Sequence, residues 1–362
     1  MAETPSKNQG PLPACAFDPT PLFDMVRWSH GSELLAAAVA HFDLFSRLNR
    51  QAMTLEEIAR ELKLAPRPAN VLLVALRAMN LIEADADGKL YPSAIARDHL
   101  VPGGEFYMGD YVGLTSENPG VKNMVQRLVT NKPIESRPDD PGAGFIFRQG
   151  IESAMDHEAP ARRLTLALAG RARIVAPALA RQLDLAGAKR LLDVGGGTGL
   201  YAIACLRANP TLRAVVWDRA EVLKVAREMA DKFGVSDRIE LIPGDMFTSP
   251  IPTGCDVMLL SNILHDWDIP ECQKLIDRCA GALAPGGTLL VHDVFLNDNL
   301  DGPLVIALYS TALFNITEGR AYSADEYRRM LRAAGLRPGD ILPTAVNCGV
   351  MPAKKTADRP GT

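Results

Sequence analysis

The chain has 362 residues, a length that corresponds to about two domains. Hydrophobic residues make up 47% and charged residues 23%, a balance that excludes a largely disordered chain. The 39 Lys and Arg against 43 Asp and Glu give a net charge of −4, whereas a protein specialised for gripping nucleic acid carries a basic surplus.

Targeting signals and metal-binding patterns are missing from the sequence. No apolar run approaches the roughly 18 residues of a membrane span, and residues 1–17 lack the apolar core of a secretory signal. The six cysteines form no Cys-x-x-Cys pair, and the six histidines show no metal-ligand spacing. We therefore expect a cytoplasmic protein with buried, reduced cysteines, no metal, and neither nucleic acid nor membrane as a partner.

The N-terminal part of the chain follows the element order of a winged-helix domain. Apolar residues recur at helical spacing from Gly31 to Asn49 and predict one helix. Thr54-Leu-Glu-Glu57 is a capping box that opens a second helix, and a third helix follows Pro66. Asp87-Gly88 lies between two short strand-like runs and predicts a hairpin. Together they predict a mainly α-helical winged-helix domain over residues 21–105.

Winged-helix domains often bind DNA, but the charge of this one argues against it. The predicted wing carries three acids, Glu83, Asp85 and Asp87, which would repel phosphates. We interpret the domain as a packing module that forms a homodimer, with a ligand-sensing transcriptional regulator as the alternative. Residues 1–20 are expected to be a disordered tail, and residues 106–183 a helical linker that lines the substrate site.

The C-terminal part changes to alternating strands and helices. The alternation predicts a doubly wound α/β domain with a mostly parallel sheet over residues 184–355. A last apolar run at residues 341–354 is interpreted as two short strands at the sheet edge. The five strand-like runs of the main sheet are residues 191–196, 214–218, 239–245, 256–262 and 288–294.

The run LLDVGGGTG carries the strongest signal for a bound ligand. Gly195, Gly197 and Gly199 permit a sharp turn from a buried strand into a helix, with the backbone close to a ligand. A dinucleotide fingerprint would place its third glycine one residue later, where the chain has leucine. The pattern instead resembles motif I of S-adenosylmethionine-dependent methyltransferases, and Asp193 suits the methionine ammonium group. The alternative is a glycine-rich turn without a ligand.

Acidic and apolar residues at the next two strand ends extend the predicted cofactor site. Asp218 follows the glycines by the spacing at which an acid accepts the ribose hydroxyls, unless it only caps a helix. Asp245 can accept from the adenine amino group, and Met246 and Phe247 can sandwich the ring. Composition alone leaves this adenine assignment open.

A histidine follows the fourth strand-like run. Ligands of open α/β sheets lie at the carboxyl ends of the strands, so His265 is expected beside the cofactor. Its ordinary pKa of about 6.5 suits a general base near neutral pH. A purely structural histidine is the alternative.

The motifs together identify a family. LLDVGGGTG, VVWD, GDMF, ILHDW and PGGTLLVHDV, in this order behind a winged-helix module, resemble the caffeate/acetylserotonin-type small-molecule O-methyltransferases over roughly residues 25–353. The resemblance implies a Rossmann-like class I methyltransferase domain, a homodimer interlocked through the N-terminal domain, and S-adenosylmethionine as cofactor. It implies methyl transfer to a small acceptor, most simply at a hydroxyl oxygen.

The resemblance also implies roles for individual residues. His265 matches the base that deprotonates the acceptor, and Asp293 matches the first of two acids that orient it. The second acid is replaced by Ala321, which leaves C-methylation or a non-methylating reaction as alternatives. Ser261 stands where relatives have a lysine in the cofactor site.

Two apolar groups are expected to line the acceptor site, and plain core packing is the alternative for both. They suggest an apolar, planar acceptor, most simply an aromatic one. One group lies at i, i+4 and i+8 of a helix and the other in the linker: Leu308, Ala312 and Ile316, and Phe145, Phe147 and Met155.

Overall fold

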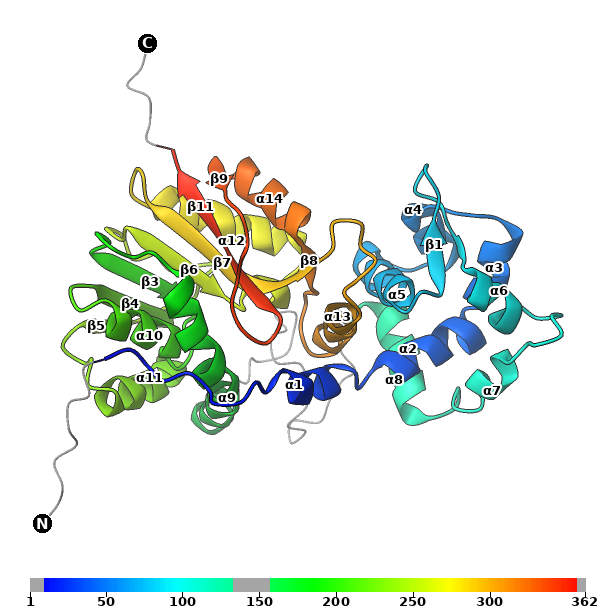
Figure 1. Cartoon of the computed structure of the whole chain (residues 1–362), viewed down its shortest axis with the longest axis horizontal. Coiled ribbons are helices and arrows are strands. Elements are labelled where there is room, and N and C mark those ends of the chain that lie inside the picture. The colour runs from blue at the N-terminus through cyan, green and yellow to red at the C-terminus, as the bar shows by residue number, and fades with distance from the viewer. Residues whose placement is uncertain (1–9, 133–156, 357–362) are drawn as a thin grey trace, which may run out of the picture.

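The computed structural model describes residues 10–132 and 157–356. The chain forms a helical N-terminal lobe and an α/β lobe, with helices α1 and α13 between them (Figure 1). The predicted fold class, a class I methyltransferase domain behind an N-terminal helical domain, is confirmed. Phe145, Phe147 and Met155 lie outside the described residues.

The N-terminal lobe packs short helices around one apolar core, which includes Leu34, Phe45 and Leu72. The capping box is formed, since Glu57 N–H donates to Thr54 Oγ1 at 3.3 Å and Thr54 N–H to Glu57 Oε2 at 2.8 Å. The elements are α2 (Gly31–Ala36), a π-helical turn (Ala37–His41), α3 (Leu44–Arg50), α4 (Leu55–Glu61), α5 (Pro66–Ala78), the antiparallel hairpin β1 (Ile82–Ala84) and β2 (Leu90–Pro92), α6 (Ala94–Leu100), α7 (Gly109–Gly113) and α8 (Pro119–Thr130).

The single helix predicted from Gly31 to Asn49 is wrong. The chain leaves α2 through the π-helical turn, and Asp43 then takes a left-handed conformation with φ 45° before α3 begins. Aspartate tolerates this conformation better than most side chains. Apolar spacing is preserved across the break, and therefore the sequence pattern did not reveal it.

Helix α1 (Thr20–Arg27) does not belong with the winged-helix core, although the predicted boundary placed it there. It packs on α13, and the Arg27 guanidinium donates to Val346 O of the α/β lobe at 3.2 Å. The preceding segment is also anchored, since Arg207 Nε donates to Gly10 O at 2.8 Å. Residues 10–19 thus lie along the α/β lobe rather than forming part of a free tail (Figure 1).

The α/β lobe is built on a twisted sheet of order β10-β11-β7-β6-β3-β4-β5. The strands from β7 to β5 are parallel to one another, as predicted, and β11 is antiparallel to β7. The prediction of two short edge strands at the C-terminus is correct only for β10. Strand β11 has eight residues and lies inside the sheet, between β10 and β7. The strands are β3 (Arg190–Val194), β4 (Arg213–Asp218), β5 (Ile239–Pro243), β6 (Val257–Ser261), β7 (Thr288–Leu296), β8 (Tyr322–Ser323), β9 (Leu336–Pro338), β10 (Leu342–Pro343) and β11 (Cys348–Lys355).

Helices cover both faces of the sheet, which explains why its strands are nearly continuous apolar runs. One apolar core contains Val216 and Leu259 with α9, α10 and α11, and the other contains Val215 and Met258 with α12 and α14. The helices are α9 (Glu158–Gln182), α10 (Leu200–Ala208), α11 (Ala220–Lys232), a 3-10 turn (Leu264–Asp266), α12 (Ile269–Ala282), α13 (Leu304–Ile316) and α14 (Ala324–Ala333).

One arginine ties the two lobes together beside the carboxyl ends of the strands. Arg67 of α5 donates through Nη1 to Thr317 O and Gly319 O, both at 3.1 Å, and its guanidinium lies 4.8 Å from the Phe314 ring centre. The segment after α13 is thereby fixed against the N-terminal lobe. The site described next lies at this junction.

Candidate active site

The glycine turn after β3 has the backbone shape that its sequence predicted. Gly195, Gly197 and Gly199 have φ values of 63°, 58° and 70°, a left-handed region that other residues rarely adopt. A Cβ at Gly195 would lie 2.6 Å from Ile263 Cδ1, whereas one at Gly197 would meet nothing within 4 Å. The Gly197 backbone therefore borders open space, where a ligand can approach it closely.

Asp193 lies directly beneath this turn and is almost fully buried. Its Oδ2 accepts the Ala202 N–H at 3.3 Å, while Oδ1 has no hydrogen-bond partner within the described chain. Burial raises the pKa of Asp193 to about 7. A buried carboxylate with a free oxygen is costly alone and is stabilised by a cation, so its chemistry fits the ammonium group of S-adenosylmethionine.

Asp218 reaches the same turn from the end of β4. Its Oδ2 accepts the Gly197 N–H at 2.8 Å and its Oδ1 accepts the Arg219 N–H at 2.7 Å. Burial raises the pKa of this carboxyl group, and the two backbone donors offset part of that effect. Each oxygen keeps a second lone pair, so the geometry is compatible with the predicted ribose contact.

Asp245 is held differently from what the sequence suggested. Its Oδ1 accepts N–H groups of Phe247 and Thr248 at 2.7 and 3.2 Å, and its Oδ2 pairs with Arg219 at 3.0 Å. The carboxylate thus caps its own turn and fixes the neighbouring arginine. Local side-chain to backbone bonds of this kind are common for aspartate in turns.

Of the two residues predicted to sandwich the adenine ring, Met246 lies at the glycine turn and Phe247 does not. A Cβ at Gly195 would lie 3.4 Å from Met246 Cε, so Met246 borders the turn. Phe247 is instead buried in the sheet core, edge-on to Trp267 at 4.8 Å between ring centres. Burying the aromatic ring in the apolar core is the larger favourable term, which explains why Phe247 leaves the turn.

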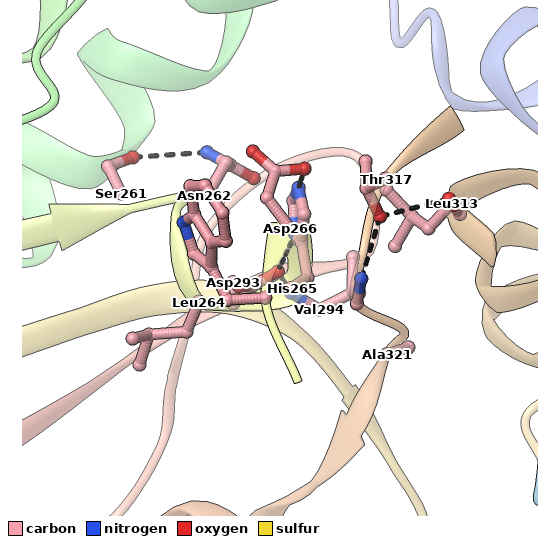
Figure 2. Close-up of polar contacts among 12 residues, drawn as sticks. Ser261, Asn262, Leu264, His265, Asp266, Asp293, Val294, Leu313, Thr317 and Ala321 are labelled. Atoms are coloured by element: carbon pink, nitrogen blue, oxygen red, sulfur yellow. Dashed lines mark hydrogen bonds and ion pairs between the residues drawn. The ribbon is translucent and has the colours of Figure 1, made fainter. Parts of the chain in front are cut away.

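His265 lies in the 3-10 turn after β6 and is almost fully buried. Its Nδ1 is 2.6 Å from Asp293 Oδ1, as Figure 2 shows. Asp293 also accepts the Val294 N–H at 2.8 Å and the Tyr327 hydroxyl at 3.0 Å. Burial alone lowers the pKa of His265, but attraction to Asp293 and Asp266 outweighs it and raises that pKa. Conversely, His265 and these donors hold the pKa of Asp293 below its usual value despite burial.

The sequence did not predict the second carboxylate beside this histidine. Asp266 Oδ1 lies 3.6 Å from His265 Nε2, and burial raises the pKa of Asp266 to about 6. Ala321, at the position of the relatives' second acid, is fully buried in an apolar cluster with Val294 and Ile306. The available signal was the aspartate within the His-Asp-Trp motif itself.

Ser261 is hydrogen-bonded within the protein at the end of β6, and its predicted cofactor contact stays a prediction. Its Oγ lies 2.8 Å from His292 Nδ1. The same oxygen accepts the Asn262 Nδ2 hydrogen at 3.0 Å (Figure 2). Asn262 also donates to the Tyr201 hydroxyl at 3.2 Å. Burial lowers the pKa of His292 to about 3, so that ring is neutral. These side chains form a buried polar network under the site that sequence reasoning had missed.

Helix α13 places one of its three predicted lining residues in the core and adds a tyrosine beside the histidine. Leu308 packs on the N-terminal lobe, where a Cβ at Gly31 would lie 3.1 Å from its Cδ2, so the core-packing alternative holds for it. Ala312 and Ile316 are partly exposed on α13. The neighbour of His265 is Tyr309, whose ring centre lies 5.8 Å away at 83° between planes. Ala312 and Ile316 follow Tyr309 by three and seven residues, so they share its face of the helix, and their place in the acceptor site stays a prediction.

Comparisons with known proteins agree with this geometry. Residues 144–337 match the O-methyltransferase domain family. A 3-hydroxy-5-methyl-1-naphthoate 3-O-methyltransferase of Streptomyces sahachiroi is 34% identical over 325 residues, which cover 89% of this chain and 91% of that protein. An L-tyrosine C(3)-methyltransferase of Streptomyces lavendulae is 28% identical over 306 residues, covering 83% and 82% of the two chains. The crystal structure of an O-methyltransferase family 2 protein from Planctomyces limnophilus, in complex with apigenin, matches with a TM-score of 0.86 and 41% identity, covering 95% and 98%.

The chain therefore belongs to the S-adenosylmethionine-dependent O-methyltransferase family, and it is an enzyme of that class. This confirms the family predicted from the sequence over the alternative of a transcriptional regulator. The cofactor prediction, S-adenosylmethionine, is confirmed as well. Within residues 10–132 and 157–356, no helix is long and apolar enough to cross a membrane, and no group of His, Cys, Asp and Glu could hold a metal ion.

Proposed function

We propose that the enzyme methylates a hydroxyl oxygen of a small aromatic acceptor and that His265 removes the hydroxyl proton. The observation that carries the proposal is the buried His265–Asp293 pair, at 2.6 Å, at the carboxyl end of β6. Nδ1 of His265 faces the Asp293 carboxylate, which leaves Nε2 to accept the proton of the acceptor hydroxyl. The aromatic naphthoate and apigenin named for two similar proteins support an aromatic acceptor.

The protein's own residues are proposed to bind, orient and move one proton. S-adenosylmethionine supplies an activated methyl group on its sulfonium when bound. The glycine turn, Asp193 and Asp218 would hold it against the sheet, and Met246 would border it. Asp293 would fix the tautomer of His265 and stabilise the imidazolium ion formed when the acceptor hydroxyl ionises. A general base of this kind contributes typically about 10²–10⁴-fold to the rate.

The test is a product analysis with labelled cofactor. Wild-type enzyme is incubated with methyl-labelled S-adenosylmethionine and a panel of hydroxylated naphthalenes and flavones, and products are identified by mass spectrometry and NMR. Methoxy products support the proposal. Products labelled only on ring carbon would establish the alternative of C-methylation, which the similar L-tyrosine C(3)-methyltransferase favours. The same histidine could serve that reaction by ionising a neighbouring phenol.

The domain roles and the homodimer are part of the same proposal. Large apolar side chains are exposed along α1 and around α7. Both helices lie along the lower edge of the molecule in Figure 1. A second copy that covers this face would explain their exposure, and it would use the N-terminal part of the chain for dimerisation. The exposed residues are Leu22, Met25, Val26, Trp28, Phe106, Tyr111 and Leu114.

Light scattering tests the dimer. Wild-type protein at micromolar concentration is expected to have the mass of two chains, and Val26→Asp is expected to weaken the dimer. Ile95→Asp on α6, also exposed, serves as the matched control. A wild-type monomer would contradict the dimer, while leaving the catalytic proposal standing. The predicted cytoplasmic location also stays a proposal, which cell fractionation can test.

A further inference from the structure

Arg171 extends from α9 toward the active site without a carboxylate partner. Its Nη2 donates to Cys348 Sγ at 2.9 Å, and its Nε has no hydrogen-bond partner within the described residues. Its charge acts on the catalytic pair, since it lowers the pKa of His265. Burial lowers the pKa of Arg171, but attraction to nearby groups raises it overall, so the guanidinium is charged.

A second arginine, Arg27, approaches the same place from α1. Its side chain is only 4% exposed, and its guanidinium lies 4.6 Å from the centre of the Tyr309 ring. Nη1 donates to Val346 O at 3.2 Å and lies 3.9 Å from Asp24 Oδ1, beyond hydrogen-bond length. Nη2 has no hydrogen-bond partner among the described residues. Burial and the charge of Arg171 both lower the pKa of Arg27.

The thiol and the two phenols beside the guanidinium ions are neutral, and one carboxylate, Asp24, lies 3.9 Å from Arg27. Burial raises the pKa of the Cys348 thiol, and it raises the pKa of both Tyr201 and Tyr309 to about 12. The carboxylate of the catalytic pair, Asp293, is already hydrogen-bonded to three donors, none of which is an arginine. Two like charges with unused N–H donors are costly to bury together, and an anion bound by both relieves that cost.

The position of Arg27 favours the acceptor over the cofactor as the source of the anion, whereas Arg171 also lies near Tyr201, two residues after Gly199 of the glycine turn. Cys348, which Arg171 contacts, lies on β11 opposite Val294 of β7. The glycine turn follows β3, which lies on the other side of β7 and is separated from it by β6. Tyr309 connects the arginines to the reacting centre, since its ring lies against Arg27 and also edge-on to His265.

We propose that Arg27 and Arg171 form an anion-binding subsite, beside Tyr309, that holds a carboxylate on the aromatic acceptor. The inference rests on the proposed function and adds a substrate class, hydroxylated aromatic acids. The two arginines would position the ring so that its hydroxyl group lies at His265 Nε2. Either guanidinium can donate two parallel N–H groups to a carboxylate, which fixes orientation as well as affinity.

The test compares two ligands that differ by one carboxylate. 3-Hydroxy-1-naphthoate and 2-naphthol are titrated into the full-length enzyme saturated with S-adenosylhomocysteine, and binding is measured by calorimetry. A charge-assisted contact predicts about 10- to 100-fold tighter binding of the naphthoate. The carboxamide of the same acid should bind like 2-naphthol, since it lacks the charge.

Variants assign the preference to the arginines. Arg171→Met and Arg27→Met should each reduce the naphthoate preference severalfold, and Arg171→Lys should retain part of it. Arg173→Met, an exposed arginine on the same helix, should leave the preference unchanged and controls for general charge. Circular dichroism verifies that each variant folds. If Arg171→Met does not fold, the naphthoate preference is measured in Arg171→Lys instead.

Four results would overturn the subsite. The first is a wild-type enzyme without the preference, and the second is a preference that survives in both methionine variants. The third is a preference lost in Arg171→Lys as fully as in Arg171→Met. The fourth is a parallel loss of S-adenosylhomocysteine affinity, which would assign the arginines to the cofactor carboxylate. Methylation is scored separately by mass spectrometry. Carboxylate-dependent binding without O-methylation would contradict only the proposed function, and O-methylation without the preference would contradict only the subsite.

Discussion

Replacing Asp293 by asparagine is the most direct test of how His265 works. Asparagine keeps an oxygen that can accept from His265 Nδ1 and the Val294 N–H, and its amide can donate to the Tyr327 hydroxyl. The three contacts of Asp293, at 2.6, 2.8 and 3.0 Å, can therefore persist. What the variant loses is the negative charge that stabilises the imidazolium ion.

The size of the effect follows from that lost charge. A hydrogen bond to a charged group contributes about 1.5–3 kcal/mol and a neutral one about 0.5–1.5 kcal/mol, so the loss is about 1–2 kcal/mol in the transition state. This corresponds to a decrease of about 5- to 30-fold in kcat. Asp293 raises the pKa of His265, so the variant should also have a lower His265 pKa.

The pH profile separates this role from a purely structural one. The base acts when His265 is neutral, so the wild-type rate should rise with pH through a midpoint above 6.5. In Asp293→Asn that acid limb should move to lower pH, while the plateau rate falls. Asp237→Asn, at an exposed position, is the control. An unmoved acid limb with an unchanged plateau would refute the assigned role of Asp293.

Three further substitutions test the rest of the site. His265→Ala should lower kcat by about 10²–10⁴-fold with S-adenosylmethionine affinity unchanged, and wild-type rates would show that no base is needed. Asp218→Ala should weaken S-adenosylmethionine binding in calorimetry by about 10- to 100-fold, and unchanged affinity would exclude the ribose contact. Ala321→Glu should lower the melting temperature and abolish turnover, because an unpaired carboxylate would be buried among Val294 and Ile306. A raised rate would instead show that the relatives' second acid can be restored.

Local patterns predicted the parts of the fold that are themselves local. The five parallel strands and the glycine turn were found because buried strands are apolar runs and because left-handed turns require glycine. The capping box at Thr54 formed for the same reason, since its partners are three residues apart. The break at Asp43 was missed because a π-helical turn and a left-handed residue leave the apolar spacing almost unchanged.

Contacts between distant segments could not be predicted from one sequence. Phe247 follows the cofactor strand in the chain, yet it packs on Trp267. The cluster around Tyr309 joins Arg27 and Arg171 to the reacting centre. These three residues come from helices that are far apart in the sequence. Motif reasoning located the histidine, but the charges that tune it became visible only in the folded chain.

Those charges act in opposite directions on one ring. Asp293 and Asp266 raise the pKa of His265, whereas burial and Arg171 lower it. Asp293 is fixed by three donors, so its contribution is constant, but Arg171 keeps an unpaired Nε that a ligand can satisfy. An acceptor carboxylate held by Arg171 would cancel part of its charge and thereby raise the pKa of His265. Acceptor binding would then strengthen the base at the moment when a hydroxyl proton is within its reach, which couples recognition of the substrate to its activation.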